Sequence, residues 1–306
     1  MKKLFALVLT LALALSLTAC GGSKEETPAD EGGETGEETV DYTTMSDDEL
    51  KAAITTVTEG TLTVATSPDF APYEFYAIGE DGQATLSGFE VSLAQYIADY
   101  LGLTLEIVPM DFDGTLMELQ NKSVDLGMAG YSPKPERENI MDFSEIFYTG
   151  GQSFVVTQDN LGKFLSLEDT NKPEYTIGAQ TGSIQVDLAK ANSPEAELIQ
   201  LPKVTDVITD LLAGNLDGAY IETVVAETYA KNYPELYVAL DVPYEQEGSV
   251  VGVSKGNAAL LEGVNRAIAA VLEDGTMDEF ITQANELASG ETYEGLLDEN
   301  GQVAEG

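Results

Sequence analysis

The chain has 306 residues, with 54 Asp and Glu against 14 Lys and Arg, one cysteine and no histidine, so its formal net charge is −40. This charge argues against a nucleic-acid partner because phosphates would be repelled, and the lack of histidine excludes most histidine-based catalysis and metal ligation. The length is sufficient for one large core or for two lobes of ordinary domain size.

The first residues carry the features of an export signal. A basic start is followed by an apolar run over 4–17, which is shorter than the roughly 20 residues of a membrane span and fits a cleaved signal peptide. The run Leu-Thr-Ala-Cys that ends at Cys20 resembles the bacterial lipobox, whose cysteine becomes the acylated first residue of the mature protein. This resemblance implies a signal peptide over 1–19 and a lipid on Cys20 that anchors an extracytoplasmic protein to the outer face of the cell membrane. A free core cysteine is the alternative.

The stretch that follows is strongly acidic. Residues 21–50 hold eleven Asp and Glu against one Lys, with many Gly and Thr and no apolar periodicity. Like charges at this density extend a chain and oppose packing, so residues 20–45 are predicted to form a disordered tether behind the lipid. An acidic cation-binding tail is the alternative for this stretch.

Helix and strand patterns then alternate along the first half of the chain. Ser46 and Glu49 make a capping-box pattern, which predicts a short helix within 46–59. The elements predicted next are a strand at 61–66, a helix at 88–101 ended by Gly102, a strand at 103–108, a helix at 115–121 and a strand at 124–129. This alternation argues for a mainly parallel α/β sheet.

The alternation restarts after residue 151, which predicts a second lobe. The elements predicted there are strands at 153–157 and 175–180, helices from 183 and at 206–213, a strand at 218–221, a helix at 222–232 and a strand at 236–240. A strand at 248–253 and amphipathic helices at 257–273 and 276–287 are expected to return to the first lobe, because they carry much apolar surface. The predicted boundaries are 60–151 and 245–306 for lobe 1 and 152–244 for lobe 2, with hinge strands near 150–153 and 240–248.

Arginine is scarce in this chain, which contains only Arg137 and Arg266. Arg137 ends the segment 129–137, where a strand end running into a loop would project its side chain toward a cleft. A guanidinium can hold a carboxylate through two parallel hydrogen bonds, and the Gly130 backbone and the Ser132 hydroxyl offer further partners to a small zwitterion. For Arg137 alone, a surface ion pair is the alternative. Arg266 lies within an amphipathic helix and is predicted to be a solvated charge.

Six short motifs stand in order around Arg137. They are Ala-Thr-Ser-Pro-Asp-Phe-Ala-Pro-Tyr-Glu-Phe at 65–75, Ser-Gly-Phe-Glu-Val-Ser-Leu at 87–93, Asp-Phe-Asp-Gly at 111–114, Val-Asp-Leu at 124–126, the loop at 132–137 and Asp-Phe-Ser at 142–144. Over about residues 60–287 the chain resembles the extracytoplasmic amino-acid-binding proteins of bacterial ABC importers, solute-binding protein family 3. The resemblance implies a periplasmic-binding-protein type II-like α/β fold, in which two lobes, each a mainly parallel sheet flanked by helices, are joined by two hinge strands.

The resemblance also assigns five residues of lobe 1 to the ligand. Phe70 and Phe112 would flank the ligand side chain, although both could alternatively be plain core residues. Gly130 and Ser132 would bind the α-amino or α-carboxylate group. Arg137 would clamp the α-carboxylate.

Three further candidates follow from the resemblance. Ser183 stands at a strand-to-helix turn, where free amide groups favour a carboxylate, but the usual small hydroxyl residue after it is Ile184 here. Glu222 takes the place of an acid, often aspartate in relatives, that accepts from the α-ammonium group. Its alternative role is to stabilise a helix N-terminus. Ser67 stands where several relatives that prefer basic or amide side chains carry aspartate.

The function implied is capture of a free L-amino acid, polar or basic, between the two lobes and its delivery to an ABC transporter permease with its ATPase. The chain is expected to act as a monomer without metal or cofactor. An extracytoplasmic dehydratase or lyase on the same fold is one alternative, and its acid or base would have to be a residue such as Glu74, Glu222, a lysine or a tyrosine. An amino-acid sensor without transport is another.

Overall fold

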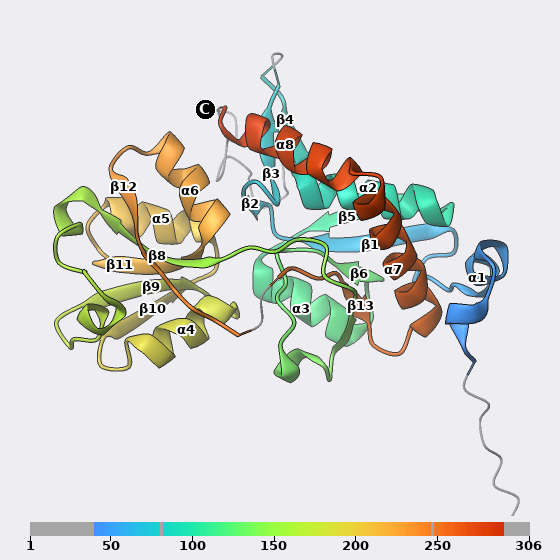
Figure 1. Ribbon diagram of the computed structural model, residues 1–306, viewed down its shortest axis with the longest axis horizontal. Coiled ribbons are helices and arrows are strands. Elements are labelled where there is room, and N and C mark those ends of the chain that lie inside the picture. Colours follow the sequence, from blue (N-terminus) through green and yellow to red (C-terminus); the bar gives the residue numbers. More distant parts are fainter. Residues whose placement is uncertain (1–39, 80–81, 246–247, 291–306) are drawn as a thin grey trace, which may run out of the picture. The chain divides into compact units, whose positions relative to one another are not determined.

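The computed structural model describes residues 40–79, 82–245 and 248–290 (Figure 1). Apart from Val40, these residues belong to one compact unit that begins at Asp41. The predicted signal peptide, the lipidated Cys20 and the tether up to residue 39 lie outside the described residues. None of the helices in the described part of the chain is both long and apolar enough to cross a membrane.

The first sheet has five strands in the order β5-β1-β6-β13-β7. The bounds of these strands are Thr61–Thr66 for β1, Thr104–Pro109 for β5, Leu126–Gly127 for β6, Met141–Phe143 for β7 and Gly252–Ser254 for β13. The helices around this sheet are α1 (Asp47–Ala53), α2 (Phe89–Leu101), α3 (Phe112–Asn121), α7 (Ala258–Glu273) and α8 (Thr276–Ala288). Helices α2, α7 and α8 pack together on one side of the sheet, and α3 packs on the other (Figure 1). We call the described residues up to 150 and from 248 lobe 1.

The second sheet also has five strands, in the order β10-β9-β11-β8-β12. The bounds of these strands are Gln152–Thr157 for β8, Thr176–Gln180 for β9, Glu197–Leu201 for β10, Gly218–Glu222 for β11 and Leu236–Asp241 for β12. The sheet is covered by α4 (Ile184–Asn192) on one side and by α5 (Val204–Leu212) and α6 (Thr223–Asn232) on the other (Figure 1). We call residues 151–245 lobe 2. One cluster of buried apolar side chains has members in both lobes.

Both sheets are mixed, with four strands of each running in the same direction and one strand, β13 or β8, running in the opposite direction. Strand β1 pairs in parallel with β5 and β6, and β9 pairs in parallel with β10 and β11. In these cases a helix between consecutive strands returns the chain to the same edge of the sheet, as a parallel pairing requires. Strand β13 is antiparallel to β6 and β7, and β8 is antiparallel to β11 and β12. β8 and β13 each follow a segment that crosses between the lobes without such a helix, and they enter their sheets in the opposite direction.

Clear local signals account for the elements whose positions the sequence predicted well. Helix α1 has the predicted capping box between Ser46 and Glu49. Helix α2 begins after Gly88 and ends at Gly102, which adopts the left-handed conformation typical of a helix C-terminus. Gly88 is also required by close packing, because a Cβ there would lie 2.0 Å from the Tyr73 carbonyl oxygen.

Elements without such signals differ from the prediction. A small sheet of β2 (Asp69–Phe70), β3 (Glu74–Ile78) and β4 (Ala84–Ser87) was not predicted, nor were β7 and β10. The strand predicted at 124–129 is only the two residues of β6, and that at 248–253 is only the three residues of β13. Short 3-10 helices occur at Tyr42–Thr44, Pro135–Arg137, Gln158–Asn160 and Leu167–Thr170.

The end of the predicted tether is folded, and Arg266 is the reason. Asp41 caps the 3-10 helix Tyr42–Thr44, whose carbonyl at Tyr42 accepts a hydrogen bond from Arg266 Nη2 at 3.1 Å. Arg266 also forms ion pairs with Asp47 and Glu262, each at 2.8 Å. The predictions that residues 41–45 are disordered and that Arg266 is a solvated charge are therefore wrong, because this side chain ties the N-terminal segment to α7.

Two chain segments connect the lobes, one before β8 and one before β13. They meet in an isolated antiparallel bridge, in which the Ser249 N–H donates to the Tyr148 carbonyl oxygen at 2.7 Å. The predicted hinge strands at 150–153 and 240–248 lie in or beside these segments.

Candidate ligand-binding site

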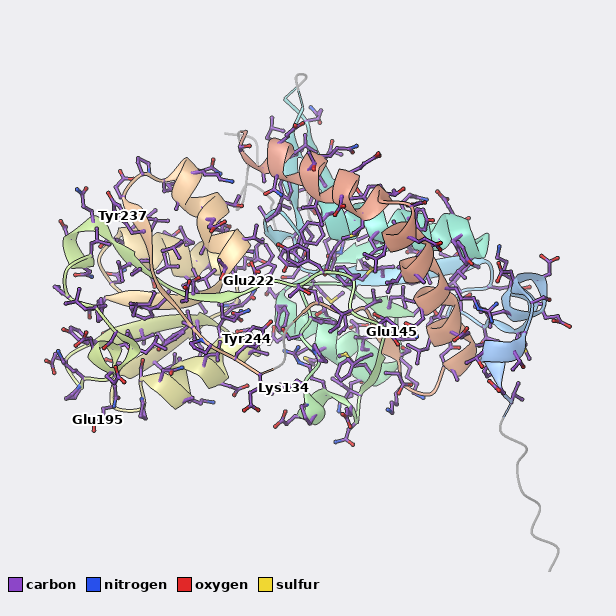
Figure 2. The ribbon with its side chains drawn as sticks, in the orientation of Figure 1. Lys134, Glu145, Glu195, Glu222, Tyr237 and Tyr244 are labelled. Atoms are coloured by element: carbon purple, nitrogen blue, oxygen red, sulfur yellow. The ribbon has the colours of Figure 1, made fainter. Side chains whose placement is uncertain are left out.

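A cavity lies between the lobes and is lined by residues from both of them. Seven of the eight predicted ligand-binding residues line it: Phe70, Phe112, Gly130, Ser132, Arg137, Ser183 and Glu222. Other residues that line it were not chosen from the sequence: Tyr73, Ala129, Gly150, Gln152, Gln180, Ile184, Gln185, Tyr244 and Ser249. In Figure 2, Glu222 and Tyr244 of lobe 2 and Lys134 of lobe 1 mark the junction of the lobes.

Ser67 is the predicted ligand residue that does not line this cavity. Its hydroxyl donates to Asp69 Oδ1 at 2.7 Å, and its side chain is buried. The structure therefore gives Ser67 a role in holding Asp69.

Arg137 is a buried cation without an anionic partner among the described residues. Its residue is only 5% exposed, and its guanidinium donates to the carbonyl oxygens of Ser132 at 3.2 Å and Gly182 at 3.1 Å. The guanidinium carbon lies 5.5 Å from the ring centre of Phe112, within the range of a cation–π contact. Burial lowers the pKa of Arg137 from its usual value. The surface ion pair that the sequence left open is thus absent, and the charge remains available to a carboxylate in the cavity.

The loop at Gly130, beside this arginine, is held by contacts with Phe70 and Glu90. Gly130 has a positive φ of 61°, and a Cβ on it would lie 2.6 Å from the Phe70 ring. Its N–H donates to both carboxyl oxygens of Glu90, at 3.1 and 3.2 Å. A glycine is therefore required both by its backbone conformation and by its contact with the aromatic wall.

Glu90 belongs to a pair of fully buried carboxyl groups with Glu74. Burial raises the pKa of Glu90 to about 7, although the Gly130 N–H opposes the shift. Burial and the neighbouring Glu90 raise the pKa of Glu74 well above its usual range. Neither carboxyl oxygen of Glu74 accepts a hydrogen bond from any described residue. Two carboxylates buried together repel each other, and the raised pKa of Glu74 favours its protonated form.

Glu222 is the carboxylate that lobe 2 presents to the cavity. It ends β11, is 4% exposed, and accepts from the Val225 N–H at 3.0 Å and the Tyr73 hydroxyl at 3.3 Å. One oxygen thus caps α6, as the alternative interpretation expected, while the other lies beside lobe 1. Burial raises the pKa of Glu222 to about 7, although the Val225 N–H and the Tyr73 hydroxyl oppose the shift. No lysine or arginine of the described chain pairs with it.

The other cavity residues are mostly neutral. Ser183 is the N-cap of α4, but its hydroxyl donates back to the Gln180 carbonyl oxygen at 2.7 Å. The amide of Gln185 donates to Gln152 Oε1 at 2.7 Å. Gly150 packs closely, because a Cβ there would lie 2.3 Å from Glu222 Oε1.

The cavity residues that were not predicted include Tyr73, which lies within the motif at 65–75, and residues of the segments that connect the lobes. The Tyr73 hydroxyl lies 3.3 Å from both Glu222 Oε1 and Ser249 Oγ. Gln152, Tyr244 and Ser249 lie in or beside the segments that connect the lobes, which have no periodicity. Phe70 and Phe112 are 8% and 6% exposed, and each both lines the cavity and belongs to a cluster of buried apolar side chains.

Comparisons with known proteins agree with this arrangement. The model of the bacterial extracellular solute-binding proteins, family 3, matches residues 62–284. The arginine-binding extracellular protein ArtP of Bacillus subtilis strain 168 is 30% identical over 283 residues, which cover 91% of this chain and 96% of that protein. The solved structure of the amino acid ABC transporter substrate-binding protein AbpA from Streptococcus pneumoniae, bound to L-arginine, is similar with a TM-score of 0.73 and 33% identity, covering 80% of this chain and 100% of that one.

A more distant relative is an enzyme. Cyclohexadienyl dehydratase of Pseudomonas aeruginosa is 27% identical over 177 residues, which cover 58% of this chain and 65% of the enzyme. The family match extends over both lobes, and the α/β architecture with mixed sheets is that of the solved relatives. The chain therefore belongs to the bacterial extracellular solute-binding proteins of family 3.

Proposed function

We propose that this protein captures a free L-amino acid with a polar or basic side chain between its lobes for an ABC importer. One observation carries the proposal: a single cavity holds a buried guanidinium from Arg137 and a buried carboxylate from Glu222, and neither has an oppositely charged partner among the described residues. Burying an unpaired charge is costly. An α-carboxylate and an α-ammonium group on one ligand would supply both missing partners.

Similarity to proteins that are named for arginine supports a ligand with a basic side chain. ArtP is an arginine-binding protein by name, and AbpA was solved with L-arginine. The aromatic rings of Phe70, Tyr73 and Phe112 in the cavity suit the aliphatic and guanidinium parts of such a side chain.

The proposed cycle uses the two lobes as separate halves of one site. Arg137 belongs to lobe 1 and Glu222 to lobe 2, so only a ligand that contacts both favours the closed arrangement. The closed form would then be recognised by a permease and its ATPase. The family places the protein outside the cytoplasm, while the lipid on Cys20 and the monomeric state remain predictions.

Thermal unfolding of the chain from Gly21 onward, which contains every described helix and strand, tests the proposal against the twenty L-amino acids. A ligand that binds only the folded state raises the unfolding midpoint. We expect a shift with one or a few amino acids, lost in Arg137→Ala and kept in the control Arg266→Ala. No shift with any amino acid, in protein first unfolded and refolded to remove bound ligand, would overturn the proposal.

An enzyme remains a second candidate because of the dehydratase relative and because Glu222 is a buried acid whose pKa of about 7 suits proton transfer. Mass spectrometry of each bound amino acid after prolonged incubation distinguishes the two. Quantitative recovery of the unchanged ligand supports the receptor. A product of different mass that disappears in Glu222→Gln would favour the enzyme.

A further inference from the structure

Helix α5 in lobe 2 has no N-terminal cap from its own segment. Its N-cap residue is Lys203, which makes no side-chain capping bond. The residues before the helix are Leu201 and Pro202, so no serine, threonine, asparagine or aspartate precedes it. The first N–H groups of a helix need acceptors when they are buried. An acceptor must therefore come from elsewhere.

The acceptor is Asp69 of lobe 1, 135 residues earlier in the chain. Its Oδ2 accepts from the Val204 N–H at the start of α5 and from Gln180 Nε2 at 3.3 Å. Both donors belong to lobe 2. Within lobe 1, Asp69 Oδ1 accepts from the Ser67 hydroxyl. The Asp69 carbonyl oxygen accepts from the hydroxyl of Tyr229, again in lobe 2, at 3.2 Å.

The environment of Asp69 makes this contact specific to the arrangement in which the lobes touch. The residue is only 5% exposed, and burial raises its pKa to about 6 although Ser67, the Val204 N–H and Lys203 oppose the shift. Asp111 is the nearby acid that adds to it. If the lobes separated, water would replace the lobe 2 donors around Asp69, and α5 would lose its cap.

We propose that Asp69 is an interlobe latch, a lobe 1 carboxylate that caps helix α5 of lobe 2 and holds the closed receptor around its ligand. The inference rests on the proposed function, because it assumes that closure retains an amino acid. Asp69 and Phe70 together form the two-residue strand β2, and Phe70 lines the cavity. The latch and one wall of the site thus move as a single element, so that closing on the ligand engages the latch.

The latch predicts slower ligand release without a change in ligand capture. We would load the chain from Gly21 with radiolabelled L-arginine, or with the amino acid that gives the largest thermal shift if L-arginine gives none, and follow its release into excess unlabelled ligand. In Asp69→Ala we expect dissociation to be about ten- to a hundredfold faster, with an association rate close to that of the wild type. The midpoint of ligand-free unfolding should change little, because the latch acts between lobes.

Asp125 offers a matched control. It is a buried lobe 1 carboxylate that accepts from two backbone N–H groups, those of Val57 and Thr63, both in its own lobe. Asp125→Ala should lower the unfolding midpoint with and without ligand while leaving the dissociation rate near that of the wild type. Asp69→Asn, which keeps an acceptor oxygen but loses the charge, should give an intermediate dissociation rate and covers the case in which Asp69→Ala folds poorly.

A second measurement observes closure itself. The chain from Gly21 has no cysteine, so Glu145→Cys in lobe 1 and Glu195→Cys in lobe 2, both exposed and labelled in Figure 2, can carry a fluorophore pair. At saturating amino acid, energy transfer in Asp69→Ala should shift toward the ligand-free value.

Two outcomes would overturn the latch. One is a dissociation rate in Asp69→Ala within about twofold of the wild type. The other is an Asp69→Ala variant that matches Asp125→Ala in both stability and dissociation, which would make Asp69 a structural residue of lobe 1. Neither outcome touches the proposed function, which fails only if the wild-type chain binds no amino acid.

Discussion

The two walls of the cleft carry opposite charges. In both walls the charged group is held by polar groups that carry no net charge, but the types of these groups differ. The Arg137 cation of lobe 1 is held by the carbonyl oxygens of Ser132 in its own lobe and Gly182 in lobe 2, and by aromatic rings. The Glu222 anion of lobe 2 is held by the Val225 N–H of its own lobe and by the Tyr73 hydroxyl of lobe 1. Partial charges orient each group without neutralising it. Each wall therefore carries a charge without an oppositely charged partner among the described residues, and under the proposed function the ligand would supply both partners.

Truncating the lobe 1 charge should have the largest effect. Removing one partner of a buried, hydrogen-bonded charge pair costs about 2–5 kcal/mol, so Arg137→Ala should weaken amino-acid binding by roughly 30-fold or more. Arg137→Lys keeps the charge but loses the planar guanidinium, so its amino-acid affinity should lie between those of the wild type and Arg137→Ala. Calorimetric titration measures this. Binding by Arg137→Ala within about threefold of the wild type would show that the ligand carboxylate lies elsewhere.

The lobe 2 charge should make binding depend on pH. The free protein holds a proton on Glu222 below a pKa of about 7, whereas the ligand ammonium needs the ionised form. Binding must then release this proton, so affinity should rise with pH up to about 7 and level off above it.

Glu222→Gln separates this effect from other titrations. We expect binding weaker by roughly tenfold at pH 8 and little remaining pH dependence. Glu90, whose pKa is also raised to about 7, and Asp69, whose pKa is raised to about 6, both persist in the variant, so any remaining slope reports on these two groups. A wild-type affinity that is flat between pH 5.5 and 8 would contradict the role given to Glu222.

Glu74 provides a contrast, since it is a buried carboxyl group behind the lobe 1 wall that does not line the cavity. Its raised pKa means that the folded state binds its proton more tightly than the unfolded chain, so stability falls as pH rises above the ordinary glutamate range. Glu74→Gln removes this titration and should be more stable than the wild type at pH 8 but not at pH 5.

Urea unfolding at the two pH values tests this, with the exposed Glu227→Gln as control. The advantage of Glu74→Gln should grow with pH, and amino-acid affinity should change little. Equal stability differences at both pH values would mean that Glu74 is not the protonated member of the pair.

The smallest effect is expected at the rim of the cleft. Lys134 of lobe 1 forms an ion pair with Asp187 of lobe 2, and their side chains are 25% and 49% exposed. Exposed pairs contribute about 0–1 kcal/mol and are screened by salt. Lys134→Ala should therefore speed ligand dissociation only a fewfold at low salt and not at all in high salt. An effect as large as that of Asp69→Ala would invalidate the distinction between buried and exposed interlobe contacts.

The sequence predicted elements with strong local signals closely. Strand β1 occupies the predicted residues, and α2 lies between the two glycines that flank it. Both could be predicted because the alternation of apolar and polar residues and the helix-capping residues are features of short stretches of sequence. Strand β10 was missed because it is short and half-exposed, and β2 because it has only two residues.

Residues that line the cavity were predicted where the family motifs lie, and contacts that join distant segments were not predicted. The hydrogen bond between Asp69 and Val204 joins residues 135 positions apart, and the sequence around either residue does not predict it. Ser67 shows the reverse case, since a motif position suggested a ligand contact and the structure turned the hydroxyl toward Asp69 instead.

Gly150 has a consequence for how such a receptor can change over evolutionary time. It lies in the first connection between the lobes, yet a methyl group there would run into Glu222. A substitution that stiffened this connection would at the same time displace Glu222, the acid proposed to meet the ligand. A substitution at this one position would thus affect both the opening of the lobes and the affinity for the ligand. A variant selected for a change in one of these properties would also change the other.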